Sequence, residues 1–181
     1  MAPSVTARAR IRVQTSMWAP AVTGLLAVGI GWGPVPATSI AVRQLSMERF
    51  VALLPAGHEL AGRRTVRSVD LSGRGVLTWP HRVNSGLCDR IIAAFDQVGA
   101  VLRIVRTAEG IATLATHVAA GEGIGLAVES DLAGRHLPGI VTVPFTGPST
   151  TAQRVVITAR NHGDPATQRL TELLLTTVRS H

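Results

Sequence analysis

Residues 75–128 decide the fold, and they read GVLTWPHRVNSGLCDRIIAAFDQVGAVLRIVRTAEGIATLATHVAAGEGIGLAV. Three short apolar runs, typical of buried strands, lie at 75–79, 101–105 and 123–128. Two amphipathic helical patterns separate them, at 87–98 and 108–120. Gly99 suits the left-handed cap that ends the first of these helices. Because strand and helix alternate, we predict an α/β fold with a mostly parallel sheet and helices on its faces.

The pattern extends to both sides of this stretch. Further strands are predicted at 9–14, 25–32, 50–54, 140–145 and 154–159. A short polar segment, 130–132, connects two of the strands. Asp164 and Pro165 are a suitable N-cap and first helical residue, so a terminal helix is expected to begin there.

The uncharged segment 13–42 allows three interpretations. It is long enough to cross a bilayer, which takes roughly 20 residues. Three arginines before it, together with Val35-Pro36-Ala37 as a small-residue cleavage site, also resemble a secretory signal over residues 1–37. Repeated Pro and Gly would interrupt either kind of helix. We therefore favour a buried strand at 25–32, and the signal peptide and the membrane span stay as alternatives.

Composition narrows the classes of function. Hydrophobic residues make up 46% and charged residues 16%, so a packed core is expected and disorder is excluded as the main state. The net charge is +7, but all eighteen basic residues are arginines spread along the chain. Nucleic-acid binding needs cations that converge on one face, so we predict a solvated surface and no direct DNA binding. The single cysteine, Cys88, excludes an intramolecular disulfide and is expected to be a small buried side chain.

Catalytic and metal-binding patterns are not found in the sequence. The six histidines show no metal spacing and the eleven carboxylates are dispersed. Gly121, Gly123 and Gly125 follow a helix and enter a strand, which is the reverse of the order in nucleotide-binding loops. Ser85, His81 and Asp89 are neighbours in sequence only, and Asp89 is expected on the solvent face of its helix. We predict a protein that is not an enzyme and needs no cofactor or metal.

Three runs carry a resemblance to a known family. The run 48–64 contains His58-Glu59-Leu60-Ala61, where the family usually has His-Pro-Leu-Ala, and 71–80 is similar to its strand followed by proline. The run 114–128 resembles its Val-Ala-Ala-Gly-x-Gly-x-x-Leu-Val-Pro segment, with Glu129 where the proline is common. The chain resembles the effector-binding (substrate-binding) domain of LysR-type transcriptional regulators.

This resemblance implies a periplasmic-binding-protein-like (type 2) fold of two lobes in a cytoplasmic regulator of transcription. The expected division is a remnant of the first lobe at 1–47, the second lobe at 48–140, and a return strand and helix at 141–181. No segment resembles the family's winged helix-turn-helix, so we expect a truncated regulator whose first lobe is incomplete. The alternative is an exported solute-binding protein of similar fold with a signal peptide.

The resemblance also implies where a small-molecule effector binds. In the first lobe the contacts fall on Thr15 or Ser16 and on Trp32. In the second lobe they fall on two loops that follow strands, and the residues are Trp79, Pro80, Arg82, Thr107 and Ala108. Both loops are expected to begin helices, with caps at Asn84 or Ser85 and at Thr107, where free backbone N–H groups favour an anion.

The family usually dimerises through a strand and a helix of its effector domains. We therefore expect a homo-oligomer, with an uncovered strand edge that favours self-association. We expect no contact with a membrane.

Overall fold

The computed structural model describes residues 28–34, 40–159 and 165–179. They form two compact units. Unit 1 contains 28–31, 40–46, 154–159 and 165–179, and unit 2 contains 32–34 and 47–153. The predicted strand 9–14 lies outside the described residues, and the predicted division at residues 48 and 140 stays a prediction.

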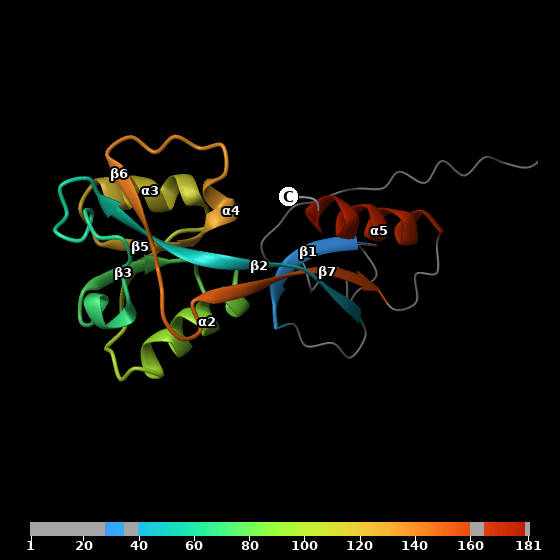
Figure 1. The fold of residues 1–181 in the computed structure, drawn as a ribbon, viewed down its shortest axis with the longest axis horizontal. Helices are drawn as coiled ribbons and strands as arrows, with labels where there is room; N and C mark the ends of the chain where they lie inside the picture. The colour runs from blue at the N-terminus through green and yellow to red at the C-terminus, as the bar shows by residue number, and fades with distance from the viewer. Residues whose placement is uncertain (1–27, 35–39, 160–164, 180–181) are drawn as a thin grey trace, which may run out of the picture. The chain divides into compact units, whose positions relative to one another are not determined.

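The sheet of unit 2 has parallel strands next to antiparallel ones (Figure 1). β3 (Gly75–Thr78) pairs in parallel with both β4 (Arg103–Thr107) and β5 (Ile124–Val128). β2 (Ile40–Pro55) runs antiparallel to β5 and to β6 (Ile140–Pro144). The sheet is therefore mixed, and not mostly parallel as the alternation of strands and helices predicted. Parallel pairing holds where helices connect the strands, because a parallel connection needs such a crossover.

Two helices flank these strands, one on each side in Figure 1. α3 (Ile111–Ala119) packs on β3, β5 and β6, while α2 (Ser85–Asp96) packs against the short 3-10 helix η1 (Ser68–Leu71). Every residue of β5 is buried, as expected for a strand covered on both faces. The largest fully buried side chains of this core come from strands and helices alike, and they include Phe50, Leu53, Leu77, Phe95 and Leu126.

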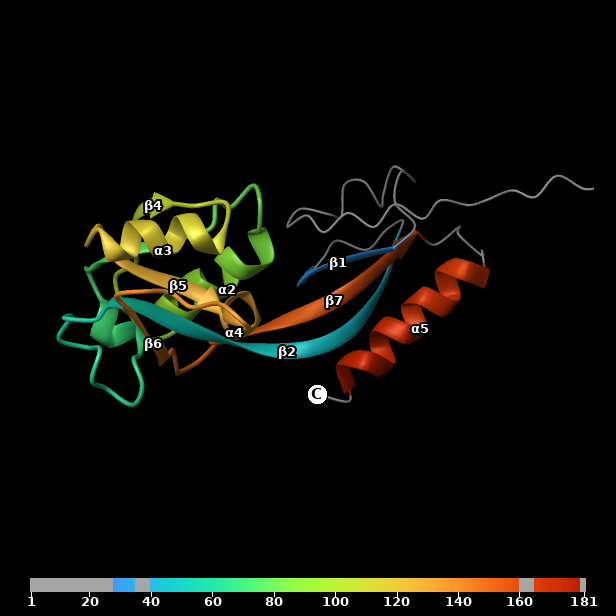
Figure 2. The ribbon, with the colours of Figure 1, turned by 90° about the horizontal axis from the view of Figure 1, so that it is seen from above.

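Unit 1 is a smaller layer of strands with one helix. It contains most of β1 (Val28–Gly33), the first part of β2, most of β7 (Thr151–Ala159) and α5 (Pro165–Arg179). Leu45 of β2, Val156 of β7 and Leu175 of α5 form a buried cluster. Figure 2 shows α5 running beside β2 and β7. Ile40, Val155 and Ile157 form a second cluster. Along β7 the neighbours Val155 and Val156 thus belong to different clusters, as the alternation of side chains in a strand requires.

Most predicted elements are found, with shifted ends. The strand predicted at 50–54 begins at Ile40, the one predicted at 101–105 lies at 103–107, and the segment 130–132 belongs to a short helix, α4 (Glu129–Leu132). The helix start at Ala108 was wrong, because α3 begins at Ile111. No helix of the described residues is long and apolar enough to cross a membrane.

Candidate functional site

The loop from β3 to α2 forms a tight turn. The N–H groups of Val83 and Asn84 both donate to the Pro80 carbonyl, at 2.9 and 3.1 Å. Of the two predicted caps, Asn84 and Ser85, Asn84 is the N-cap of α2, and its side-chain oxygen accepts from the Leu87 N–H at 3.5 Å. The loop is fixed by its own backbone, so the residues between Thr78 and Gly86 hold defined positions at the carboxyl end of β3.

Residues 32–34 cross the first turn of α2. A Cβ atom placed on Gly86 would lie 2.9 Å from the carbonyl oxygens of both Trp32 and Gly33, a distance that real Cβ atoms do not show. The Trp32 side chain is half-buried and packs against the core of unit 2. Glycine at position 86 is therefore what allows this segment to approach the start of the helix.

A second loop, from β4 to α3, lies against the first. The Ala108 N–H donates to the Thr78 carbonyl at 2.9 Å. Arg82 of the first loop forms an ion pair with Glu109 of the second, and both side chains are exposed, at 74% and 65%. Three segments that are distant in sequence thus meet at the carboxyl end of β3.

Two buried polar atoms at this place lack hydrogen-bond partners among the described residues: Thr78 Oγ1 and Asn84 Nδ2. Thr78 is 1% exposed and Asn84 is 4% exposed. A buried polar atom without a partner costs about 1–3 kcal/mol, so native proteins keep few of them and often for function. The sequence prediction missed Thr78, and it treated Asn84 only as a cap. The signal in the sequence that could have indicated Thr78 was its hydroxyl, at the end of the predicted strand.

The predicted site residues are brought together to different degrees. Trp79 is 3% exposed and belongs to the core, as does Ala108 at 4%, while Pro80 is half-buried and Arg82 and Thr107 are exposed. Two details were wrong: Gly110, not Thr107, is the N-cap of α3, and the Ala108 N–H is already bonded. Both errors arise because β4 continues to Thr107. Thr15 and Ser16 lie outside the described residues.

The titratable groups of this region make contacts within the protein. Cys88 is buried, its thiol donates to the Trp79 carbonyl at 3.3 Å, and burial raises its pKa to about 11, with a smaller contribution from Asp89. Such a thiol is a poor nucleophile. His81 contacts Asp89 at 2.8 Å, and Asp89 is exposed as predicted. The described residues contain no group of three or more His, Cys, Asp or Glu that could hold a metal ion.

Loops that converge at the end of parallel strands, beside a helix start, define the class of α/β ligand-binding domains. The LysR substrate binding domain matches residues 2–179, and the chain belongs to this family. The predicted fold class and family are thereby confirmed. No curated protein matches the sequence.

Solved structures of LysR regulators share the fold. The effector binding domain of QuiR, in complex with shikimate, has a TM-score of 0.80 at 16% identity and covers 94% of this chain and 80% of that one. OxyR of Corynebacterium glutamicum, a C206 mutant, has a TM-score of 0.76 at 21% identity, covering 91% and 51%. CbnR has 0.73 at 17% identity, covering 86% and 54%. The chain thus spans about half the length of CbnR and of OxyR.

Proposed function

We propose that the chain binds a small anionic effector at the carboxyl end of β3 and acts as a sensor without catalytic activity. The observation that carries this is a pair of buried polar atoms, on Thr78 and Asn84, that have no hydrogen-bond partner in the described part of the chain and lie where three segments meet. Asn84 Nδ2 can only donate a hydrogen bond, and the Thr78 hydroxyl can donate or accept. A ligand oxygen that reaches both atoms would remove their desolvation penalty.

Arg82 gives the proposed site its preference for anions. It is exposed and already paired with Glu109, so a ligand carboxylate would have to compete with that side chain. Replacing Glu109 by Gln should therefore tighten the binding of an anion by about two- to fivefold, since exposed ion pairs contribute about 0.2–1 kcal/mol. Replacing Arg82 by Gln should weaken it.

Calorimetric titration with a panel of small carboxylates, including shikimate, tests the proposal. We expect at least one to bind, with an affinity about tenfold lower in Thr78→Val, which loses the hydroxyl. The control is Arg64→Gln, because Arg64 is exposed and lies in another loop. A panel that binds equally well to the wild type and to Thr78→Val would contradict the placement of the site.

Self-association through the β4 edge is the second part of the proposal. β4 stands at the end of the strand order, and Ile104 and Val105 on it are 44% and 42% exposed. Val101 before it and Val98 after α2 are exposed as well, at 62% and 38%. An exposed apolar edge strand favours pairing with a second copy. Sedimentation velocity of Ile104→Lys against the wild type checks this, and we expect a shift towards monomer.

We further propose that the protein works in the cytoplasm and does not by itself bind DNA. Family membership supports a regulatory role inside the cell. The mass of the purified, natively expressed protein tests the location, since export would remove about the first 37 residues at the cleavage-like signature. A mass that corresponds to this loss would contradict a cytoplasmic protein.

A further inference from the structure

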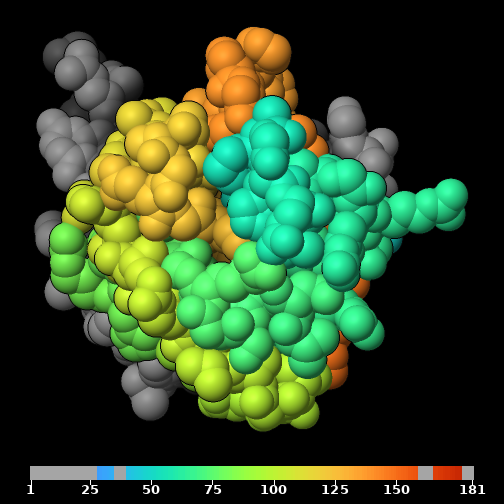
Figure 3. Space-filling model, turned by 90° about the vertical axis from the view of Figure 1, so that its left-hand side faces the viewer, coloured from blue at the N-terminus to red at the C-terminus, as the bar shows by residue number. Residues whose placement is uncertain are grey.

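A pocket lies at the amino end of the same strands, where β3 and β5 begin and β2 ends. Its volume is about 140 Å³. Figure 3 faces this end of unit 2, where the segments near residues 58, 75 and 121 adjoin one another. The residues that matter for its chemistry are His58, Arg74, Gly75, Gly121, Gly123 and Ile124.

Glycines keep one wall of this pocket free of side chains. A Cβ atom on Gly123 would lie 2.6 Å from Leu77 Cδ1 and 2.7 Å from the Gly75 carbonyl oxygen. Gly121 has a φ of +76°, a conformation that residues with a side chain rarely adopt. Both positions favour glycine, so this part of the pocket is lined by backbone.

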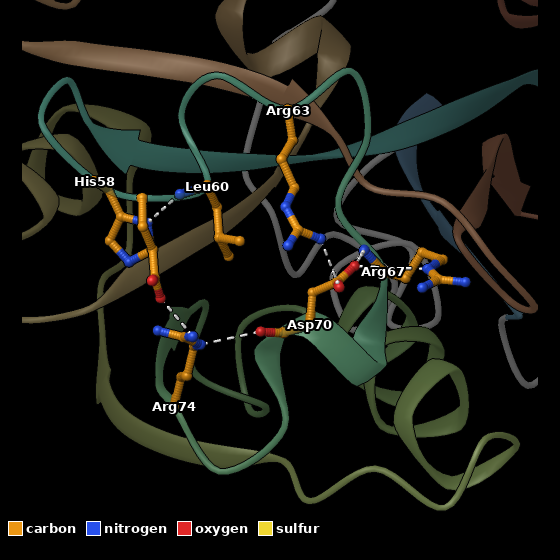
Figure 4. A network of polar contacts seen from close by, with 7 residues as sticks. His58, Leu60, Arg63, Arg67, Asp70 and Arg74 are labelled. Atoms are coloured by element: carbon orange, nitrogen blue, oxygen red, sulfur yellow. Dashed lines mark hydrogen bonds and ion pairs between the residues drawn. The ribbon is translucent and has the colours of Figure 1, made fainter.

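His58 contributes a hydrogen-bond donor. Its Nδ1 accepts from the Leu60 N–H at 3.1 Å, so the neutral imidazole carries its proton on Nε2 (Figure 4). No residue of the described part of the chain bonds to Nε2. The neighbouring backbone therefore fixes the tautomer and leaves the N–H of this ring available.

Arg74 contributes the positive charge, and other residues hold it in place. Its Nε donates to the Asp70 carbonyl at 3.0 Å, and Nη2 pairs with the Glu59 carboxylate. Asp70 in turn accepts from Arg63 Nη1 and from the Arg67 N–H, both at 2.9 Å (Figure 4). The guanidinium is thus positioned before any ligand arrives, and Nη1 makes no hydrogen bond to a described residue.

We propose that this pocket binds a short-chain carboxylate. The carboxylate would accept from Arg74 and from the Nε2–H of His58, and the alkyl chain would lie against Ile124. A cavity of about 150 Å³ holds a benzene molecule, so the volume suits a ligand of about six heavy atoms. The site does not depend on the effector site at the other end of β3.

An NMR titration of the whole chain tests this site directly. Butyrate is the probe, and butyramide is the neutral molecule of the same shape. We expect butyrate, and not butyramide, to give saturable shifts of the Gly75, Gly121 and Gly123 amide signals. Inorganic phosphate, an anion without an alkyl chain, forms a third arm of the experiment and should bind more weakly than butyrate.

Two charge variants separate recognition from folding. Arg74→Gln should weaken butyrate binding by about tenfold, since it removes a charged hydrogen bond. Glu59→Gln should strengthen it by about two- to fivefold, because Glu59 competes for the same guanidinium. Arg64→Gln removes the same positive charge as Arg74→Gln, but from an exposed residue in the loop that contains Glu59, and it should leave butyrate binding unchanged.

Several outcomes would overturn the proposal. Equal binding of butyrate and butyramide would remove the role of the charge. Phosphate that binds more tightly than butyrate would replace the short-chain ligand by an inorganic oxyanion. Weaker binding in Glu59→Gln would show that loop structure, not competition, controls the site. An absence of saturable shifts with all three probes would eliminate the site.

Discussion

The two ends of β3 differ in whether their polar groups have hydrogen-bond partners. At the carboxyl end, Thr78 Oγ1 and Asn84 Nδ2 are buried without hydrogen-bond partners among the described residues. At the amino end, the Asp70 carboxylate is paired with Arg63 and with the Arg67 N–H. Satisfied groups stabilise the fold, whereas unsatisfied ones cost stability and are typical of places reserved for a ligand. The Asp70 carboxylate at the amino end is thus satisfied within the chain, whereas the carboxyl end keeps two buried polar atoms without a partner among the described residues.

Two carboxyl groups near the amino ends of β3 and β5 have a lowered pKa. The pKa of Asp70 is lowered, chiefly by the hydrogen bond from the Arg67 backbone and also by the charges of Arg63 and Arg67. The pKa of Glu122, near the amino end of β5, is lowered by its hydrogen bond from His117 and by Arg106. A depressed carboxyl pKa contributes stability above the ordinary pKa, and this stability is lost as the pH falls through the lowered value. Acid should therefore weaken the amino end first.

Gly86→Ala should have the largest effect on stability. The new methyl group would meet the carbonyl oxygens of Trp32 and Gly33 at 2.9 Å, and such overpacking costs about 1–3 kcal/mol. Urea unfolding measures the loss. Gly110→Ala is the matched control, because a Cβ there meets nothing within 4 Å. Equal stability of the two variants would show that residues 32–34 do not press on α2.

Asp70→Asn should destabilise the amino end by about 1–2 kcal/mol near neutral pH, because a charge-assisted hydrogen bond and an ion pair are lost. The loss should shrink at acid pH. Asp70 stabilises the wild type above its ordinary pKa of 3.8, and that contribution disappears below its lowered value. Urea unfolding at several pH values checks this. The exposed Asp96→Asn serves as control, and a pH-independent difference for Asp70→Asn would contradict the assignment.

Thr78→Val should change stability in the opposite direction, by raising the free energy of unfolding. The buried Thr78 hydroxyl has no partner among residues 28–34, 40–159 and 165–179, so its removal at nearly constant shape is expected to stabilise the chain by about 1 kcal/mol. Thermal unfolding measures the gain, with the exposed Thr113→Val for comparison. Together with weaker effector binding, a gain in stability would show that the carboxyl end keeps this group at a cost. A loss of stability would mean that the hydroxyl already has a partner.

Arg82→Gln and Glu109→Gln should change stability least, by under about 0.5 kcal/mol each, because this exposed pair is screened by water. Their effect should appear in ligand affinity instead. A large loss of stability in either variant would make the pair a structural contact. The double variant distinguishes the two cases, since a structural pair would show coupling in the thermal unfolding of the four proteins.

The family and the order of elements could be predicted from the sequence. Short apolar runs predicted β3, β4 and β5, and helical spacing of apolar residues predicted α2, although β4 is exposed at every residue. The ends of elements were less accurate. β4 continues to Thr107 because its pairing with β3 includes Thr78 and Thr107, and pairing with a distant strand leaves no local signal.

The sequence predicted where the candidate site lies, but not which of its polar groups already have partners. The sequence by itself determined that two loops follow parallel strands and that Trp79-Pro80 and Arg82 lie on one of them, since these are properties of neighbouring residues. Only the tertiary structure decided that Trp79 is core, that the Ala108 N–H bonds to Thr78 and that Arg82 pairs with Glu109. Partners of polar groups come from segments far apart in the chain, so no local pattern reports whether such a group is satisfied.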